Sequence, residues 1–228
     1  GRHAAEALAS NGRVELAAIV ARGSSRSVEL AQRLGATLET DIATAITSTR
    51  PALACVAVGE RQHEEIVSAL LDADCHVMCS HPVAPRAETV LRLADLAARR
   101  GRLTVTDYSL SASPRFEAFT SAWKLEGTLL RLAVEYPGRL LPMALDLSLR
   151  VAGPVRASWS SHVYPPVVDA AKSRSRAAFP PTIVIEHTSG VVTALTPIPH
   201  ADPARAFRLV ASLTKARVTC ELPLGATT

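Results

Sequence analysis

The sequence is poor in lysine, in aromatic side chains and in long apolar runs. Lysine supplies three of the 25 basic residues, and aromatic residues make up 4% of the 228 positions. Because the arginines are scattered, the sequence shows neither a basic stripe for phosphates nor an aromatic platform for bases, and no nucleic acid is expected as a partner. No apolar run approaches the roughly 18 residues of a membrane-spanning helix, so no membrane contact is expected. The hydrophobic content of 48% is ample for a packed core.

Cysteine is also scarce, and its spacing argues against a metal site. The four cysteines lie in apolar or strand-like surroundings, which is typical of reduced thiols in a cytoplasmic protein. On a strand, Cys75 and Cys79 stand about 13 Å apart at roughly 3.3 Å per residue. One zinc ion with bonds of ~2.3 Å cannot bridge that distance, and neither can a disulfide. We therefore expect Cys75, Cys79 and His81 to bind no metal.

Strands and helices alternate from Val14 to Asp107, which predicts a Rossmann-type α/β fold with a parallel sheet. The expected strands are 14–20, 52–58, the stretch from Cys75, and 103–107; the expected helices are 1–10, 27–34, 41–48, 60–72 and 85–100. A dinucleotide-binding unit places a strand and a glycine turn before its first helix. Because this chain opens on a helix, we expect that strand and most of the loop to precede Gly1. Residues 1–228 alone are then expected not to hold a pyrophosphate normally.

Beyond Pro114 the pattern becomes α+β. Helices are expected at 115–124 and 140–151, and strands at 128–136, 155–163, 182–188, 191–198, 207–213 and 216–222. Turn signals at Ser189-Gly190 and Thr214-Lys215 predict hairpins and hence an antiparallel sheet. We therefore expect two domains, 1–113 for the cofactor and 114–228 for the substrate, with a C-terminal sheet through which identical chains can associate. Residues 165–181, with the basic cluster Lys172–Arg176, are expected to form a loop.

The stretch Cys75–Ala84, which reads CHVMCSHPVA, places His81 at the end of an expected strand. Pro82 cannot donate to a strand ladder and biases the residues before it toward an extended or turn conformation. Open α/β sheets bind their ligands at the carboxyl ends of strands, so this position predicts a site. The alternative is a histidine that only bonds backbone or water.

This stretch resembles the E-K-P motif of the glucose-fructose oxidoreductase/inositol dehydrogenase (Gfo/Idh/MocA) family. Ser80 stands in place of the glutamate and His81 in place of the lysine. With Tyr108 in T-D-Y-S-L, the chain is similar to one subgroup, the thiazolinyl imine reductases of nonribosomal siderophore pathways. The resemblance implies NADPH-dependent reduction of a C=N bond, thiazoline to thiazolidine, on a substrate tethered to a carrier protein. His81 or Tyr108 would then donate the proton; the alternative for Tyr108 is a core tyrosine.

Two other functions stay open beside this one. The first is a family relative that acts on a sugar or another carbonyl, and the second is a cofactor-binding protein without catalytic activity. The helix before Gly153 resembles the family's H-x-x-D helix, whose histidine and aspartate face the substrate. Asp146 matches the aspartate, but Met143 occupies the histidine position. The resemblance thus implies a substrate contact for Asp146 and argues against polyol oxidation; the alternative for Asp146 is a polar break in an apolar face.

The residues Arg22, Ser24, Ser25 and Arg26 follow the expected strand 14–20, where NAD-binding folds carry an acidic residue. Arginine accommodates the additional phosphate of NADP, because a guanidinium binds phosphate oxygens in pairs. We therefore predict NADP as the cofactor. The alternative is an ordinary helix N-terminus with Ser24 or Ser25 as its cap.

Four more residues are predicted to lie at the cofactor: Gly1, Gly59, His63 and Pro82. Gly1 is expected to be the last residue of the glycine loop, and Pro82 is the proline of the stretch that resembles the E-K-P motif. Gly59 permits a close approach of the backbone. His63 matches a histidine that many family members have after their fourth strand; the alternative is a surface histidine in the first turn of a helix.

Overall fold

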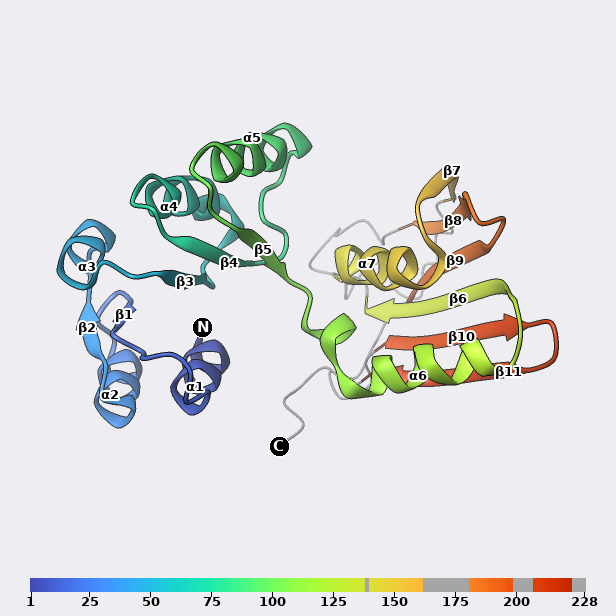
Figure 1. The fold of residues 1–228 in the computed structure, drawn as a ribbon, viewed down its shortest axis with the longest axis horizontal. Coiled ribbons are helices and arrows are strands. Elements are labelled where there is room, and N and C mark those ends of the chain that lie inside the picture. Colours follow the sequence, from blue (N-terminus) through green and yellow to red (C-terminus); the bar gives the residue numbers. More distant parts are fainter. Residues whose placement is uncertain (138–139, 162–180, 199–206, 223–228) are drawn as a thin grey trace, which may run out of the picture. The chain divides into compact units, whose positions relative to one another are not determined.

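The computed structural model describes residues 1–137, 140–161, 181–198 and 207–222 (Figure 1). They belong to two units, Gly1–Asp107 and Tyr108–Thr228. The expected loop 165–181, including Lys172–Arg176, lies outside the described residues except for Pro181. Among the helices described, none is long and apolar enough to cross a membrane.

The first unit alternates helices and short parallel strands, which confirms the predicted Rossmann-like fold. Its elements are α1 (Arg2–Ser10), β1 (Ala18–Val20), α2 (Ser25–Leu34), β2 (Thr37–Glu39), α3 (Ile42–Thr49), β3 (Leu53–Val56), α4 (Glu60–Asp72), β4 (His76–Ser80), α5 (Ala87–Arg99) and β5 (Thr104–Asp107). The strands form two sheets, β1–β2 and β3–β4–β5, and every pair is parallel. Among the described residues, no strand pairs with the outer edge of β1 or of β3.

Local sequence explains where α2 begins and ends. The Ser24 hydroxyl accepts a hydrogen bond from the Ser27 amide, and this satisfies one of the amides left unbonded at a helix N-terminus. Gly35 ends the helix in the left-handed conformation at φ +67°, which glycine adopts without steric cost. The capped first turn of α2 therefore follows directly on the loop that carries Arg22.

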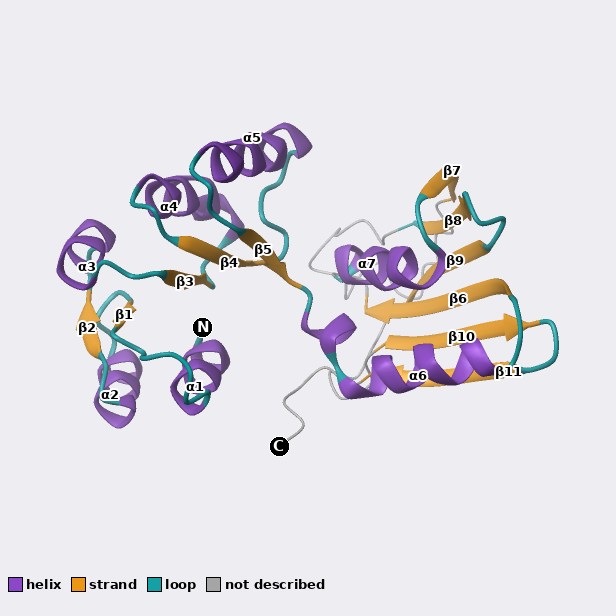
Figure 2. Ribbon diagram, in the orientation of Figure 1, coloured by secondary structure: helices purple, strands orange, loops and turns teal. Residues whose placement is uncertain are grey.

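The sheet β3–β4–β5 is covered on one face. Right-handed crossovers between neighbouring parallel strands place α4 and α5 on the same side (Figure 2). Val56, Val77 and Cys79 point to these helices and are buried. On the other face, Leu53, Met78 and Val105 are 43%, 38% and 52% exposed. The continuous apolar run 52–58 is typical of a doubly covered strand, but both helices share one side and leave the second face open.

The second unit carries a six-stranded sheet with two helices. Its elements are the 3₁₀ helix η1 (Ser109–Ala112), α6 (Pro114–Leu125), β6 (Leu129–Pro137), α7 (Leu141–Ala152), β7 (Val155–Ser161), β8 (Thr182–His187), β9 (Val192–Ile198), β10 (Phe207–Leu213) and β11 (Arg217–Leu222). The strand order is β11-β10-β6-β9-β8-β7. The core between helices and sheet contains Phe116, Leu132, Leu147 and Leu195.

The predicted antiparallel sheet is mixed in one place. The hairpins β8–β9 and β10–β11 are antiparallel, as the turn signals predict, whereas the central pair β6–β9 is parallel. A parallel partner needs a long connection, which α7, β7 and β8 provide between β6 and β9. The correction concerns this one pairing, and the sheet stays mostly antiparallel.

Candidate active site

His81 lies directly after β4, as the sequence predicts. The His81–Pro82 peptide bond is cis, and the half-buried imidazole has its Nδ1 atom 3.2 Å from the carbonyl oxygen of Asp107 at the end of β5. A carbonyl oxygen only accepts hydrogen bonds, so this contact assigns a proton to Nδ1. Nε2 is then the proton-accepting atom of the neutral ring.

His63 lies in the first turn of α4 and is 1% exposed, so the surface alternative is wrong. Its Nδ1 atom lies 3.0 Å from the Pro82 carbonyl oxygen and 3.2 Å from that of Val83. Its Nε2 atom lies 3.0 Å from the Val58 carbonyl oxygen and 3.4 Å from the Ser80 hydroxyl. The ring thus joins the loop after β3 to the turn after β4, and its cofactor contact stays a prediction.

Two glycines leave space near the end of β3. Gly59 is the N-cap residue of α4, and a β-carbon built on it meets nothing within 4 Å. Gly1 is the N-cap residue of α1 and lies beside Ala57, whose carbonyl oxygen would be 3.9 Å from such a β-carbon. The amino end of α1 therefore lies at the carboxyl end of β3, an arrangement in which helix amides can bind an anion. Both glycines fit a bound dinucleotide.

The residues predicted to bind the additional phosphate of NADP are exposed, and they lie on the loop after β1 and at the start of α2. They are Arg22, Ser24, Ser25 and Arg26. Arg22 precedes Gly23, whose φ of +74° turns the chain, and Arg26 is the second residue of α2. Within the described part of the chain, neither arginine forms an ion pair. Ser24 caps α2, so the capping alternative is confirmed for this hydroxyl. A capping hydroxyl does not prevent the arginines from binding a phosphate.

Tyr108 and Asp146 belong to the second unit and lie near each other. Burial raises the pKa of the Tyr108 hydroxyl, and the negative charge of Asp146 raises it further. Asp146 is on α7 with its side chain 15% exposed, and Arg150 Nε donates to both of its carboxylate oxygens at 3.0 Å. Sequence reasoning missed Arg150, although its spacing of four residues from Asp146 on a helix is a signal for this pair.

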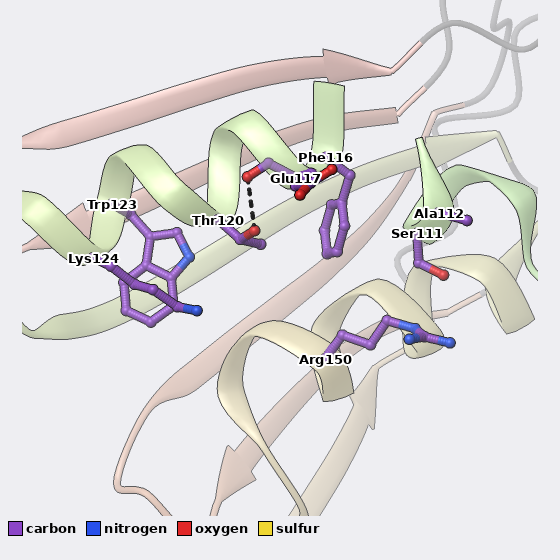
Figure 3. Close-up of a pocket in the computed structure, with 8 residues that line it drawn as sticks. All are labelled: Ser111, Ala112, Phe116, Glu117, Thr120, Trp123, Lys124 and Arg150. Atoms are coloured by element: carbon purple, nitrogen blue, oxygen red, sulfur yellow. Dashed lines mark hydrogen bonds between the residues drawn. The ribbon is translucent and has the colours of Figure 1, made fainter. Parts of the chain in front are cut away.

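An open hollow of about 380 Å³ adjoins this pair (Figure 3). Residues of η1, α6 and α7 line it, and the Arg150 guanidinium lies beside Ser111. Met143, in the position of the family's histidine, is 6% exposed and packs in the core of the second unit. A thioether there offers no proton and fills the core instead.

The structure brings together His81, Pro82, His63 and Gly59 at the carboxyl ends of β3 and β4. His81 lies in the first unit and Tyr108 in the second, so each belongs to the site of its own unit. Cys75 and Cys79 are buried, and burial raises the pKa of each thiol to about 11. Among the described residues, no group of three metal-ligating side chains is found.

Residues 1–108 match the model of an oxidoreductase family with an NAD-binding Rossmann fold, GFO_IDH_MocA. This part of the chain belongs to the Gfo/Idh/MocA oxidoreductase family. The match covers β3, β4 and β5 with the turn that carries His81, and it ends at Tyr108. Among curated proteins, no sequence matches the chain.

Solved structures share the fold over nearly the whole chain. GenD2 from gentamicin A biosynthesis, in complex with NAD, has a TM-score of 0.77 at 20% identity, covering 95% of this chain and 68% of that chain. A myo-inositol dehydrogenase from Corynebacterium glutamicum has a TM-score of 0.82 at 14% identity, covering 97% and 72%. A probable dehydrogenase from Thermotoga maritima has 0.82 at 16% identity, covering 97% and 73%. At these identities the likeness establishes the fold of both units.

Proposed function

We propose that this protein is an NAD(P)-dependent oxidoreductase acting on a hydroxyl-bearing or carbonyl carbon of a sugar-like substrate, with His81 as the proton carrier. The observation that carries the proposal is the place of His81 in a Gfo/Idh/MocA domain, at the end of β4 with Nδ1 bound to the Asp107 carbonyl oxygen. Similar structures include myo-inositol dehydrogenases, and this supports a sugar or polyol rather than an imine as the substrate.

The chemistry asked of His81 is a proton transfer at Nε2. When bound, the nicotinamide would accept a hydride from the substrate carbon, or supply one in the reverse direction. As the C–H electron pair leaves, the substrate O–H bond breaks, its proton goes to Nε2, and its electrons form the carbonyl bond. The hydrogen bond from Nδ1 to Asp107 keeps the lone pair of the neutral ring on Nε2.

Tyr108 suits a different role. Because burial and Asp146 both raise its pKa, its hydroxyl keeps its proton at neutral pH and gives it up reluctantly. A hydroxyl of this kind donates a hydrogen bond to a substrate oxygen, which orients the substrate without transferring the proton. This supports His81 rather than Tyr108 as the proton carrier.

For the cofactor, we propose NADP. The amino end of α1, Gly1 and Gly59 would lie along the pyrophosphate, while Arg22 and Arg26 would hold the additional phosphate. The loop that carries Arg22 has no acidic side chain to bind the ribose hydroxyl of NAD. Two of the similar structures are complexes with NAD, so both cofactors belong in the test.

The second candidate is reduction of a C=N bond, as in thiazolinyl imine reductases. The specific observation in its favour is the pair of replacements, histidine for the motif lysine at His81 and a buried methionine at Met143. Reduction of an imine needs only one proton, delivered to nitrogen. One proton carrier at His81 is sufficient for that reaction.

A substrate panel separates the candidates. The full-length protein is assayed by nicotinamide absorbance with NADP⁺ or NAD⁺ and a set of sugars and polyols, and with NADPH and cyclic imines, including a thiazoline on a carrier protein. Turnover of a sugar or polyol supports the main proposal, and turnover of imines alone supports the second candidate. Cofactor binding without turnover of any compound would indicate a non-catalytic protein.

A further inference from the structure

The four contacts of His63 set it apart from an ordinary helix residue. In the first turn of α4 it is 1% exposed, and each ring nitrogen lies 3.0 Å from a main-chain carbonyl oxygen, Pro82 for Nδ1 and Val58 for Nε2. Two further oxygens, of Val83 and Ser80, lie 3.2 Å and 3.4 Å away. The four oxygens belong to the loop after β3, to the last residue of β4 and to the turn after β4.

The contacts favour a proton on Nδ1 of His63. Nδ1 faces two carbonyl oxygens, of Pro82 and Val83, which can only accept, whereas Nε2 faces one, of Val58, and the Ser80 hydroxyl, which can donate to it. The residues on either side of His81 in this turn, Ser80 and Pro82, thus both lie within hydrogen-bonding distance of one buried ring. His81 then reaches across to β5 through its own bond to the Asp107 carbonyl oxygen. Two histidines therefore connect the carboxyl ends of β3, β4 and β5 in series.

We infer that His63 is a positioning residue: by contacting the Ser80 hydroxyl and the Pro82 carbonyl oxygen, on the two sides of His81, it fixes the bond between His81 Nδ1 and Asp107 and so directs Nε2 of His81. This role deepens the proposed function and rests on it for its catalytic consequence. The positional consequence, the tautomer of His81, can be measured without any substrate.

Loss of the His63 ring should shift the turn that carries His81, because this ring contacts Ser80, Pro82 and Val83. In His63→Leu, the carbonyl oxygens of Pro82 and Val83 lose their donor, and a carbonyl oxygen left without a donor away from water is costly. The turn then shifts to reach other donors. A reacting group displaced by about 1 Å can lose 10²-fold in rate, so even a small shift of His81 is catalytically important.

The test uses long-range ¹H–¹⁵N spectra of the histidine rings in the full-length protein, with His63 and His81 assigned from single substitutions. In the wild type, both rings should be protonated at Nδ1. In His63→Leu, the Nδ1–H form of His81 should fall to a minority. In His63→Asn, the side-chain amide can still donate to Pro82, so His81 should stay mainly Nδ1–H.

An unchanged His81 tautomer in folded His63→Leu would overturn the inference, because a merely structural histidine lowers stability without altering that ring. If His63→Leu does not fold, the wild-type spectrum still decides: a His63 ring without a proton on Nδ1 contradicts the contacts on which the role rests.

Kinetics then separate this role from the proposed function. With the best substrate of the panel and saturating NADPH, kcat of His63→Leu should fall roughly 10- to 100-fold. If the His81 tautomer changes but kcat does not, His63 positions His81 as inferred. His81 is then not the proton carrier, and the proposed function is refuted instead. An unchanged tautomer with lowered kcat would refute the positioning role alone.

Discussion

Replacing Arg22 and Arg26 with alanine tests the predicted phosphate contact of NADP. Both side chains are exposed, one on the loop after β1 and one in the first turn of α2. In the described structure, no acidic side chain forms an ion pair with either of them, so the substitutions break no such bridge. The double variant should keep its fold, and its effect should fall on the cofactor.

The expected size follows from the bonds that are lost. A hydrogen bond to a charged group contributes about 1.5–3 kcal/mol, and exposure to solvent favours the lower end. With ~1.4 kcal/mol lost at each arginine, the double variant should bind NADPH roughly 100-fold more weakly. NADH has no such phosphate, so its affinity should change by less than about twofold.

The assay is calorimetric titration of the full-length protein with each cofactor. Arg33→Ala is the matched control, since it removes the same charge from the last turn of α2, about 10 Å along the helix at 1.5 Å per residue. Arg33 bonds Glu6 at 2.6 Å, and the NADPH to NADH ratio should not change in this control. Equal losses for the two cofactors in the double variant would refute the phosphate assignment.

Further predictions concern Asp146, the two buried thiols and the second sheet. In Asp146→Asn, kcat/KM should fall roughly 10- to 100-fold if the carboxylate binds substrate, and absorbance titration should show a lower pKa for Tyr108, whose hydroxyl no longer faces that charge. Cys75 and Cys79 should not react with a thiol reagent at pH 8 in the folded protein, because burial raises their pKa from 9.0 to about 11. Thermal stability should accordingly be lost as the pH rises from 9 through about 11, since the folded state holds these protons more tightly; a flat profile would contradict the shift. Identical chains are predicted to associate through the face of the second sheet away from α7, so Ala133→Arg should yield monomers in light scattering, and no change in mass would refute this surface.

Local signals in the sequence predicted the elements that carry the site. The helix 60–72 has its predicted bounds, because Gly59 precedes it and an apolar face runs along it. Pro82 ended the strand 76–80 as expected, and this places His81 in the turn. Strand 37–39 was missed because three residues are too short to show an alternating pattern.

Tertiary contacts could not be predicted in the same way. His63 binds carbonyl oxygens, and main-chain atoms carry no residue-specific signal in a sequence. The parallel pairing of Arg131 with Val192 joins strands far apart in the chain, and it depends on how α7 packs. The bond between Arg150 and Asp146 could have been predicted from the sequence, since helix residues four apart are neighbours.

The most direct test of the central claim is the turnover of His81→Asn on the best substrate of the panel. An asparagine amide can still donate to the Asp107 carbonyl oxygen, as Nδ1 does at 3.2 Å, but it cannot carry a proton. We expect kcat to fall roughly 10²- to 10⁴-fold, the usual contribution of general acid–base catalysis. NADPH affinity should stay nearly unchanged, and Tyr108→Phe should lose less. Wild-type turnover by His81→Asn would contradict the account.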